Sequence, residues 1–447
     1  MDKIPIVTVF GGNRMKRRYA IVGLGYRGTY MFLEPMIKNY AEVTELAALC
    51  DINQQRAALA KERTKRNTPI YTDYKKMISE IDCDTVIVST PDYIHHEVII
   101  AALLSGKDVI SEKPLTISEG ACQEILKAEQ ESGKKVTVTF NARFLPYTIK
   151  IKELVLAGKV GQVHSVELHW FLDTVHGADY YRRWHAEIEK SGGLLIHKAT
   201  HHFDLVNWFI QQAPEKVYAT GDLNYFGKKG RNYGKRCLTC ERKQDCPFHL
   251  DICADPELKE LYFDREQADG YLRDRCVFDE RVNIYDTMSL NVRYNRGAVL
   301  TYTLNSCMPF EGWQLVINGS LGRLECGMPH SFYPHETFNL QKRTEIGKTI
   351  DPRQAAMGDL TLQTEGTISF YPTFGGVEVY KVPHASGDHG GSDELLRHKL
   401  FHGVGEDPLG QMADSWAGAM SLLIGAAANK SIVTGMPVTI DSLLKQN

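Results

Sequence analysis

A glycine-rich turn near the amino terminus limits the folds open to this chain more than any other feature. Gly23-Leu24-Gly25-Tyr26-Arg27-Gly28 has the spacing G-x-G-x-x-G and directly follows the apolar run Tyr19 to Val22. The first glycine permits a tight turn, the second lets a phosphate approach the backbone, and the third lets the next helix pack closely. Free N–H groups at the start of that helix would face a pyrophosphate. The turn therefore predicts a dinucleotide-binding βαβ unit.

The pattern after the turn extends this unit to a whole domain. Apolar strand-like runs alternate with helix-like segments, with strands expected at 19–22, 45–50, 85–89, 108–111 and 136–140 and helices at 54–64 and 117–132. Strands that alternate with helices of this length form parallel sheets. We predict an α/β protein in which residues 1–140 form a Rossmann domain with a doubly wound parallel sheet. A short extension is expected before Arg18.

The end of the second strand indicates which dinucleotide binds. Asp51 stands 23 residues after Gly28. An acidic side chain at this place accepts hydrogen bonds from the adenosine ribose hydroxyls and repels a 2′-phosphate. NAD is therefore the expected cofactor. NADP is the alternative, because Arg56 lies near enough to bind a 2′-phosphate.

Beyond residue 140 the pattern changes to that of a mostly antiparallel sheet. The segments 163–171, 288–294, 299–304 and 314–317 alternate apolar and polar residues. We predict that residues 141–447 form an α+β domain for substrate binding and oligomerisation, with one face of a large sheet covered and the other solvated or paired with another subunit. A helix over 414–430, rich in small residues, is expected to dock on the first domain.

Length and composition set the wider class. A chain of 447 residues exceeds what one hydrophobic core usually supports, so two domains are expected. The net charge of −3 gives no basic excess for nucleic acid or an anionic membrane. No apolar run reaches the roughly 18 residues that span a bilayer, and no secretory signal is read. A cytoplasmic protein without nucleic-acid or membrane partners is expected.

Two further motifs stand where predicted parallel strands end. Thr90-Pro91, with His95 nearby, follows the third strand, and Glu112-Lys113-Pro114 follows the fourth. Ligands of open α/β sheets bind at the carboxyl ends of the strands, so Lys113 is expected beside the cofactor. Pro114 restricts Lys113 to extended conformations. A solvated lysine before a turn is the competing interpretation.

Together these motifs resemble those of the Gfo/Idh/MocA oxidoreductases, a family that includes glucose–fructose oxidoreductase and inositol dehydrogenases. The segment from Ser191-Gly192-Gly193 to His201 and Asp204 is similar to the family's G-G-x-L-x-D-x-G-x-H-x-x-D. The resemblance continues to Gly435–Val438 and covers nearly the whole chain. It implies NAD(P)-dependent hydride transfer at a secondary hydroxyl of a sugar, glycoside or cyclitol, by a homodimer or homotetramer.

The resemblance also implies three catalytic positions. Lys113 matches the family's lysine and His201 its histidine, while His197 stands where an aspartate is usual. Histidine titrates near neutrality, which suits removal of a hydroxyl proton. Desolvation and a positive nicotinamide would lower the pKa of a lysine. We predict that Lys113 and His201 share the proton and that His197 orients the substrate.

The spacing of His197 and His201 leaves other interpretations open. Residues four apart share one face of a helix, and HxxxH is also a zinc-ligand spacing. The metalloprotease motif carries a glutamate after the first histidine, where this chain has Lys198. A metal site and purely structural histidines remain as alternatives.

Residues around these motifs are expected to line the cleft. Tyr180-Tyr181-Arg182-Arg183-Trp184-His185 combines rings and arginines that suit sugar faces and hydroxyls, although an aromatic core with surface arginines is an equal alternative. The predicted substrate ligands are Lys113, Arg143, Arg183, Trp184, His197 and His201. The predicted cofactor ligands are Gly23, Gly25, Tyr26, Arg27, Gly28, Asp51, Thr90, Pro91, His95, Glu112, Lys113 and Asn141.

One group of cysteines is clustered in a polar insertion expected at about 225–280. Cys237, Cys240, Cys246 and Cys253 lie within it, and such spacing can hold a tetrahedral zinc, with His249 or Cys276 as further candidates. A disulfide and free thiols are the alternatives. The remaining cysteines are scattered, which is typical of reduced thiols.

Three functions stay open. The first is the dehydrogenase described above. The second is an NAD-dependent glycoside-cleaving enzyme that acts by transient oxidation and elimination, a chemistry that relatives in this superfamily perform and that His197 keeps open. The third is a non-catalytic nucleotide or sugar sensor, against which the pair Lys113 and His201 argues, because a sensor needs no acid and base.

Overall fold

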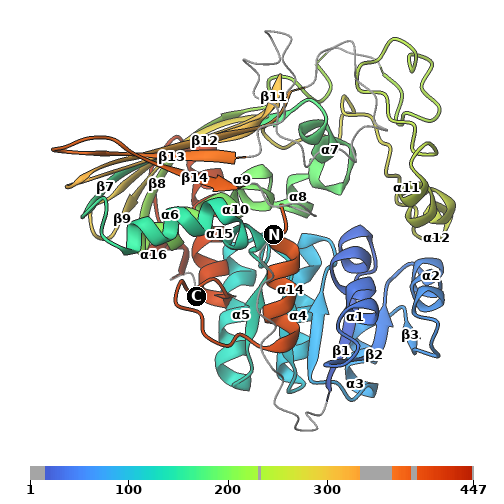
Figure 1. Cartoon of the computed structure of the whole chain (residues 1–447). Helices are drawn as coiled ribbons and strands as arrows, with labels where there is room; N and C mark the ends of the chain where they lie inside the picture. Colours follow the sequence, from blue (N-terminus) through green and yellow to red (C-terminus); the bar gives the residue numbers. More distant parts are fainter. Residues whose placement is uncertain (1–15, 230–232, 333–364, 384–389, 445–447) are drawn as a thin grey trace.

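A seven-stranded sheet organises the first part of the chain (Figure 1). In this computed structural model, which describes residues 16–229, 233–332, 365–383 and 390–444, the strand order is β15-β6-β5-β4-β1-β2-β3. All neighbours run parallel except β15, which is antiparallel to β6. The predicted parallel sheet is confirmed. The strands are β1 (Arg17–Val22), β2 (Thr44–Cys50), β3 (Ile70–Tyr71), β4 (Thr85–Val88), β5 (Asp108–Ser111), β6 (Val136–Val138) and β15 (Ala413–Asp414).

Helices cover both faces of this sheet, which explains why its strands read as unbroken apolar runs. Ala20 and Val22 of β1 enter one hydrophobic core, and Tyr19 and Ile21 enter another. The extension expected before Arg18 lies almost wholly outside the described residues. The helices are η1 (Gly28–Leu33), α1 (Glu34–Lys38), α2 (Gln54–Thr64), α3 (Tyr74–Glu80), η2 (Asp92–Ile94), α4 (His95–Leu104) and α5 (Glu119–Ser132), with α14 (Ser392–His402) from late in the chain.

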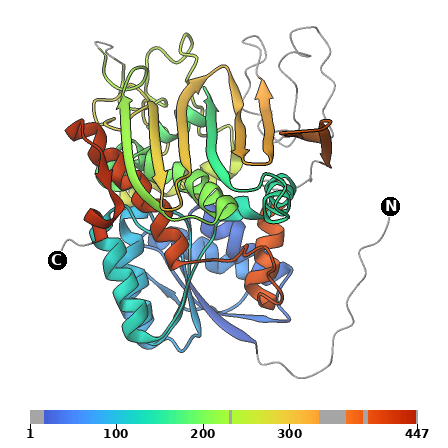
Figure 2. The ribbon, with the colours of Figure 1, turned by 90° about the vertical axis from the view of Figure 1, so that its left-hand side faces the viewer.

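A nine-stranded sheet forms the second part, and helices lie between the two sheets (Figure 2). Its order is β14-β13-β12-β11-β7-β10-β9-β8-β16, and only β7 and β10 pair in parallel. The prediction of a large, mostly antiparallel sheet is confirmed. The strands are β7 (Val163–Asp173), β8 (Pro214–Asp222), β9 (Thr287–Tyr294), β10 (Val299–Met308), β11 (Phe310–Gly319), β12 (Gly322–Phe332), β13 (Glu365–Pro372), β14 (Glu378–Pro383) and β16 (Val438–Thr439).

Burial alternates along the central strands of this sheet, so one face is covered and the other is not. In β10, Leu300, Tyr302 and Leu304 are buried, while the intervening threonines are half-buried. The covering helices and neighbouring turns are η3 (Asn141–Phe144), α6 (Pro146–Leu156), α7 (His176–Arg182), η4 (Trp184–Ala186), α8 (Ile188–Ser191), α9 (Leu194–His197) and α10 (Ala199–Ile210).

The helix α15 (Ser415–Thr434) contacts both halves of the molecule, followed by α16 (Ile440–Leu444). A Cβ on Gly425 would come within 2.3 Å of the Leu195 carbonyl oxygen in α9. One on Gly418 would come within 3.0 Å of Val138 in β6. The small residues therefore let α15 pack closely against the parallel sheet and against the segment that carries His197.

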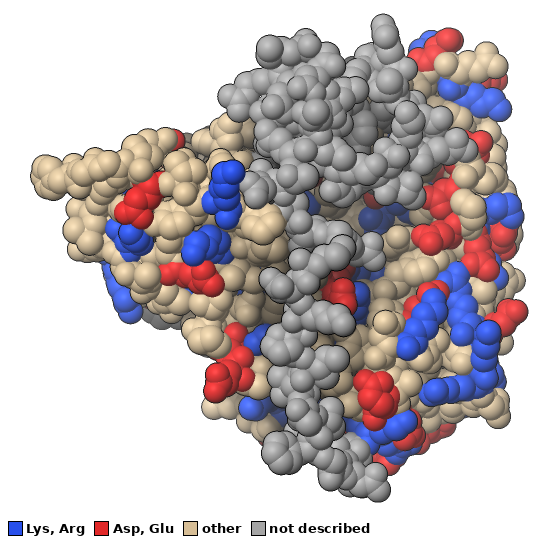
Figure 3. Space-filling view, in the orientation of Figure 1, with Lys and Arg blue, Asp and Glu red and all other residues tan. Residues whose placement is uncertain are grey.

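The connection between β8 and β9 reaches over the first domain (Figure 1). It contains α11 (Pro256–Leu261), η5 (Phe263–Arg265) and α12 (Glu266–Asp269), and its Leu258, Leu261 and Tyr262 form an apolar cluster with Leu59 of α2. On the face shown in Figure 3, positive and negative side chains are interspersed. No helix among the described residues is long and apolar enough to cross a membrane.

Candidate active site

The glycine turn has the geometry that a dinucleotide requires. Gly23 has a φ of +94°, and a Cβ there would meet the backbone of Ser89 at 2.5 Å. A Cβ on Gly28 would lie 2.0 Å from the Gly23 carbonyl oxygen. Both positions therefore exclude a side chain, and backbone N–H groups line the turn. The residues present fit a bound dinucleotide.

Asp51 ties the end of β2 to the glycine turn. Its carboxylate accepts hydrogen bonds from the N–H groups of Leu24 and Asn53, both at 2.8 Å, and from Arg56 Nη1 at 2.9 Å. Arg56 also pairs with Asp269 at 2.9 Å and is buried. The cation that could have bound a 2′-phosphate is thus already neutralised by two carboxylates.

A tyrosine from the β8–β9 connection reaches the same turn. The Tyr262 hydroxyl accepts a hydrogen bond from the Tyr26 N–H at 2.9 Å and would be the nearest atom, at 3.2 Å, to a Cβ on Gly25. The neighbouring Asn53 donates to the Arg265 carbonyl oxygen at 2.9 Å. Sequence reading missed this contact, because nothing local links residues more than 200 positions apart.

Two of the predicted cofactor ligands, Arg27 and Asn141, bind one acidic residue of α14, and Arg27 also binds a third, Glu112. Arg27 binds Asp393 through both terminal nitrogens, at 2.7 and 3.0 Å, and Glu112 through Nε at 2.8 Å. Asn141 donates to the same Asp393 at 2.7 Å. Asp393 is buried. The network of Arg27, Glu112 and Asn141 around it connects α14 to the glycine turn.

His95 connects the two strand-end motifs. Its Nδ1 lies 2.8 Å from the Pro114 carbonyl oxygen and its Nε2 lies 2.9 Å from that of Thr90. The ring is buried, and burial lowers its pKa. His95 therefore holds the loops that carry Pro91 and Lys113 at a fixed separation.

Lys113 lies in the centre of a group of buried polar side chains. Its Nζ donates to the His197 carbonyl oxygen at 3.0 Å. Burial lowers its pKa to about 8, against the opposite effect of the Asp92 charge. A lysine in this range exchanges a proton near neutral pH.

Asp92 is the partner that sequence reading missed. Its Oδ2 lies 2.6 Å from His197 Nδ1, and both side chains are buried. Burial raises the pKa of Asp92 well above its usual value, and burial followed by the Lys113 charge lowers that of His197. A signal was available, because Asp92 directly follows Thr90-Pro91 at the end of a parallel strand.

Aromatic rings surround His197. Tyr180, Trp184 and His185 have ring centroids 5.5, 5.8 and 4.0 Å from it. His185 Nδ1 is buried without a hydrogen-bond partner among the described residues, and so is Arg183 Nε. The structure thus brings the predicted Arg183 and Trp184 to His197, with unpaired polar nitrogens beside the rings.

His201 lies further along the chain in α10, and Arg143 of η3 pairs with a residue of the same helix. His197 and His201 belong to consecutive helices separated at Lys198, and His201 packs edge-on against Phe140 with centroids 5.7 Å apart. Arg143 binds Asp204 through two nitrogens, at 2.8 and 2.6 Å, and both are buried. The predicted substrate ligand Arg143 is therefore placed in an internal ion pair and not among the residues around His197.

Neither of the two metal sites considered from the sequence, the HxxxH pair and the cysteine quartet, has the predicted arrangement in the structure. No group of three or more histidine, cysteine or acidic side chains in the described part of the chain is arranged to hold a metal ion. The HxxxH pair therefore has no third ligand there. The quartet of Cys237, Cys240, Cys246 and Cys253 is also wrong, because Cys253 is exposed and does not line the pocket that the other three share.

The fold and this site define the chain as an oxidoreductase with an NAD-binding Rossmann domain. Residues 17–140 match the model of the oxidoreductase family with NAD-binding Rossmann fold, and residues 152–440 match its C-terminal alpha/beta domain. The chain belongs to the Gfo/Idh/MocA family, as the motifs indicated.

Among its relatives, YteT of Bacillus subtilis (strain 168), whose name describes an oxidoreductase without a substrate, is 34% identical over 443 residues, which cover 95% of this chain and 97% of YteT. Inositol 2-dehydrogenase of Salmonella typhimurium is 28% identical over 199 residues, which cover 44% of this chain and 56% of that enzyme.

Solved structures share the fold at low identity. Levoglucosan dehydrogenase in complex with NADH and levoglucosan has a TM-score of 0.64 at 17% identity, over 95% of this chain and 100% of that one. The WlbA dehydrogenase of Bordetella pertussis, with NADH and UDP-GlcNAcA, has a TM-score of 0.61 at 17% identity, over 95% and 98%.

Proposed function

We propose that this protein is an NAD-dependent dehydrogenase that transfers hydride between a secondary hydroxyl of a sugar, glycoside or cyclitol and the nicotinamide. One observation carries the proposal. The half-buried Lys113 and the buried Asp92 follow β5 and β4, and both contact the buried His197 of α9, so the three form one group at the carboxyl ends of these strands. Acid–base groups at this edge of the sheet are placed for chemistry on a ligand beside the cofactor.

The cofactor proposal rests on the turn and on Asp51. The N–H groups of the turn would hold the pyrophosphate, and Asp51 the adenosine ribose. Arg56 is occupied by Asp51 and Asp269, which supports NAD over NADP. When bound, NAD supplies the acceptor for the hydride that leaves the substrate carbon.

The proton of the substrate hydroxyl goes to Lys113 in this proposal. A pKa of about 8 leaves a fraction of Lys113 neutral at neutral pH, so its Nζ lone pair can take that proton. His201 is the second candidate acid–base group, as the family resemblance implies. His197, held by Asp92, orients the substrate through the ring nitrogen that Asp92 leaves available.

The substrate class follows from the surroundings of His197. Tyr180, Trp184 and His185 form an aromatic cluster beside His197. Trp184, the half-buried member, stacks on His185 with centroids 3.7 Å apart and is the ring we propose to contact the sugar. His185 Nδ1 and Arg183 Nε have no hydrogen-bond partner among the described residues. A buried polar atom without such a partner lowers the stability of the fold. A ligand rich in hydroxyls would satisfy them, in keeping with the inositol and levoglucosan named for the relatives.

A second function is favoured by the presence of two separate proton acceptors. Oxidation of an alcohol needs one base, which Lys113 provides. The Asp92–His197 pair offers another. Cleavage of a glycoside by transient oxidation needs that second base, because the C–H next to the new carbonyl must be deprotonated before the aglycone leaves.

A screen of sugars, glycosides and cyclitols tests both proposals. The dehydrogenase reduces NAD in proportion to product, while the glycoside-cleaving enzyme releases aglycone without accumulating NADH. Lys113→Ala and His201→Ala are each expected to abolish turnover and to leave NADH binding within a few-fold. Full activity in both variants refutes the roles assigned to these residues, and binding of NADH without turnover on any substrate favours a sensor.

We also propose that the chain forms a homodimer or homotetramer through the uncovered face of the nine-stranded sheet. Its alternating burial leaves a broad row of half-buried residues, including Thr301 and Thr303. Light scattering during size-exclusion chromatography gives the mass directly, and a mass of one chain of 50.4 kDa refutes the proposal.

A further inference from the structure

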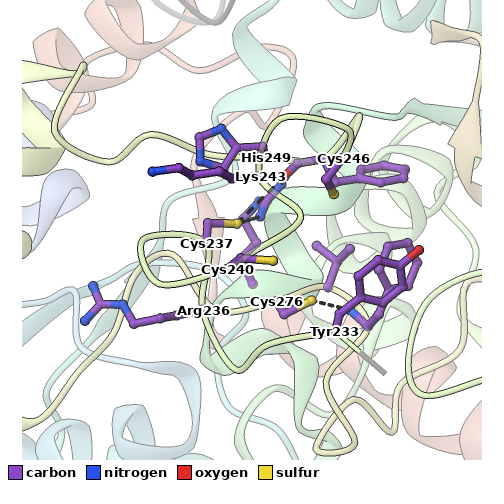
Figure 4. Close-up of a pocket in the computed structure, with 12 residues that line it drawn as sticks. Tyr233, Arg236, Cys237, Cys240, Lys243, Cys246, His249 and Cys276 are labelled. Carbon is purple, nitrogen blue, oxygen red and sulfur yellow. Dashed lines mark hydrogen bonds between the residues drawn. The ribbon is translucent and has the colours of Figure 1, made fainter. Parts of the chain in front are cut away.

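Four cysteines of the β8–β9 connection line one pocket (Figure 4). They are Cys237, Cys240, Cys246 and Cys276, and Arg182 and His249 lie at the same pocket. Cys237 is buried and the other three are half-buried. Their sulfur atoms face a shared space, while the ring of His249 points away from them.

Backbone hydrogen bonds bring together Cys237 and Cys276, the two cysteines of this group that lie furthest apart in the sequence. The Cys237 N–H donates to the Asp274 carbonyl oxygen at 2.8 Å, and the Cys276 N–H donates to that of Lys235 at 3.0 Å. Both bonds flank an antiparallel bridge between the residues at 236 and 275. Cys276 is therefore brought to Cys237 by local strand pairing, which sequence spacing alone could not show.

Donors surround the sulfur atoms in the manner of outer-shell groups at a thiolate metal site. The Phe278 N–H donates to Cys276 Sγ at 3.4 Å, and Arg182 Nη1 donates to Cys237 Sγ at 3.2 Å. Such donors stabilise negative charge on sulfur.

The chain around these cysteines contains little regular secondary structure. From 233 to 255 it forms turns and one isolated bridge, without helix or strand. Structureless segments of this length are uncommon in compact domains unless something constrains them. A cross-link between sulfur atoms at 237, 240, 246 and 276 would supply that constraint.

We propose that Cys237, Cys240, Cys246 and Cys276 are the ligands of a structural zinc ion. Four thiolates close the tetrahedral shell of zinc and leave no position for a substrate, which makes the ion structural. In this structure the four sulfur atoms do not have the arrangement around a common centre that a bound metal ion requires. Binding requires the thiols to turn about their Cα–Cβ bonds and to release their protons.

A thiol must lose its proton before it can bind zinc as a thiolate. Zinc competes with these protons, and affinity is expected to fall as the pH is lowered. The zinc affinity falls at low pH because a protonated thiol is no longer a ligand.

The loop that carries Cys237, Cys240 and Cys246 is connected to the cofactor site by ion pairs. Arg236, next to Cys237, binds Glu266 of α12 through two nitrogens at 2.9 and 3.0 Å. Asp269, at the end of the same helix, binds Arg56 beside Asp51. The metal would therefore fix the segment that covers the adenosine side of the glycine turn.

Metal analysis of the full-length protein, purified without chelator or affinity metal, tests the proposal. We expect about one equivalent of zinc in the wild type and in Cys253→Ser, the matched control, and less than a tenth in Cys240→Ser and Cys276→Ser. Less than a tenth of an equivalent in the wild type overturns the proposal, as does full retention in Cys276→Ser.

A second measurement covers the case in which the serine variants do not fold. Wild-type protein from which zinc has been removed and replaced by cobalt should show the intense visible absorption of tetrahedral cobalt–thiolate. Cobalt that is not bound by the four thiolates lacks this absorption. Thiol titration after denaturation with chelator should count all ten cysteines. A count of eight without bound metal indicates a disulfide and refutes the zinc site.

Discussion

Replacing Asp92 by asparagine should move the pH dependence of catalysis in a direction that the structure fixes. Asp92 is buried beside His197, and its negative charge raises the pKa of Lys113, which burial lowers to about 8. Asparagine keeps the shape and can still accept the His197 N–H, but it carries no charge. The pKa of Lys113 should therefore fall.

The size of the shift follows from the charge that is lost. An opposite charge within roughly 4–6 Å changes a pKa by about 1–3 units, or about 1.4–4 kcal/mol. At pH 7 a lysine of pKa about 8 is roughly one-tenth neutral, and after a fall of two units it would be mostly neutral. Oxidation needs neutral Lys113, so the rise of kcat/KM with pH should shift downward by about 1–3 units.

The assay is the pH profile of kcat/KM for NAD reduction by the substrate that the screen identifies. Asp82→Asn is the matched control, because it removes the same charge from an exposed position and should leave the midpoint unchanged. A midpoint that stays within 0.3 units in Asp92→Asn, or that moves upward, would refute the assignment of Lys113 as the base.

Substitutions at Gly28, Arg143 and Tyr262 each remove or disturb one contact of the structure. Gly28→Ala should abolish NADH binding, measured by fluorescence titration, because its Cβ would lie 2.0 Å from a carbonyl oxygen of the turn; unchanged affinity contradicts the cofactor site. Arg143→Met leaves Asp204 charged and buried, which costs about 3–5 kcal/mol in urea unfolding, and adding Asp204→Asn should recover part of this loss; a loss below 1 kcal/mol contradicts it. Tyr262→Phe frees the N–H of the glycine turn for a phosphate, so the Kd for NADH in calorimetry should fall about two- to fivefold; a rise would show that the hydroxyl holds the cofactor instead.

The parallel sheet could be predicted closely because its signals are local. The expected helix over 54–64 and the strand over 108–111 have the bounds of α2 and β5. Apolar runs between helices and a glycine turn are properties of neighbouring residues, and the sequence displays them directly. The same holds for the alternating strands β9 and β10 of the second sheet.

The site could be predicted only where a motif marks it. Lys113 and His197 were found in this way, but Asp393 and Tyr262 were not, because each reaches the cofactor turn from more than 200 residues away. The choice of Cys253 failed for the same reason. Spacing along the chain favoured it, whereas strand pairing brings Cys276 to the other thiols.

The histidine at position 197 can be understood from its partner. The family resemblance places an aspartate here, and its replacement by histidine would remove a negative charge from beside Lys113. Asp92 restores that charge 2.6 Å behind the imidazole, so the site keeps one lysine and one carboxylate. The carboxylate now acts through a ring, which reaches further toward the substrate and can carry a proton between its two nitrogens. A base of this kind beside Lys113 is what an elimination after oxidation would use, and it is the reason to assay aglycone release together with NAD reduction.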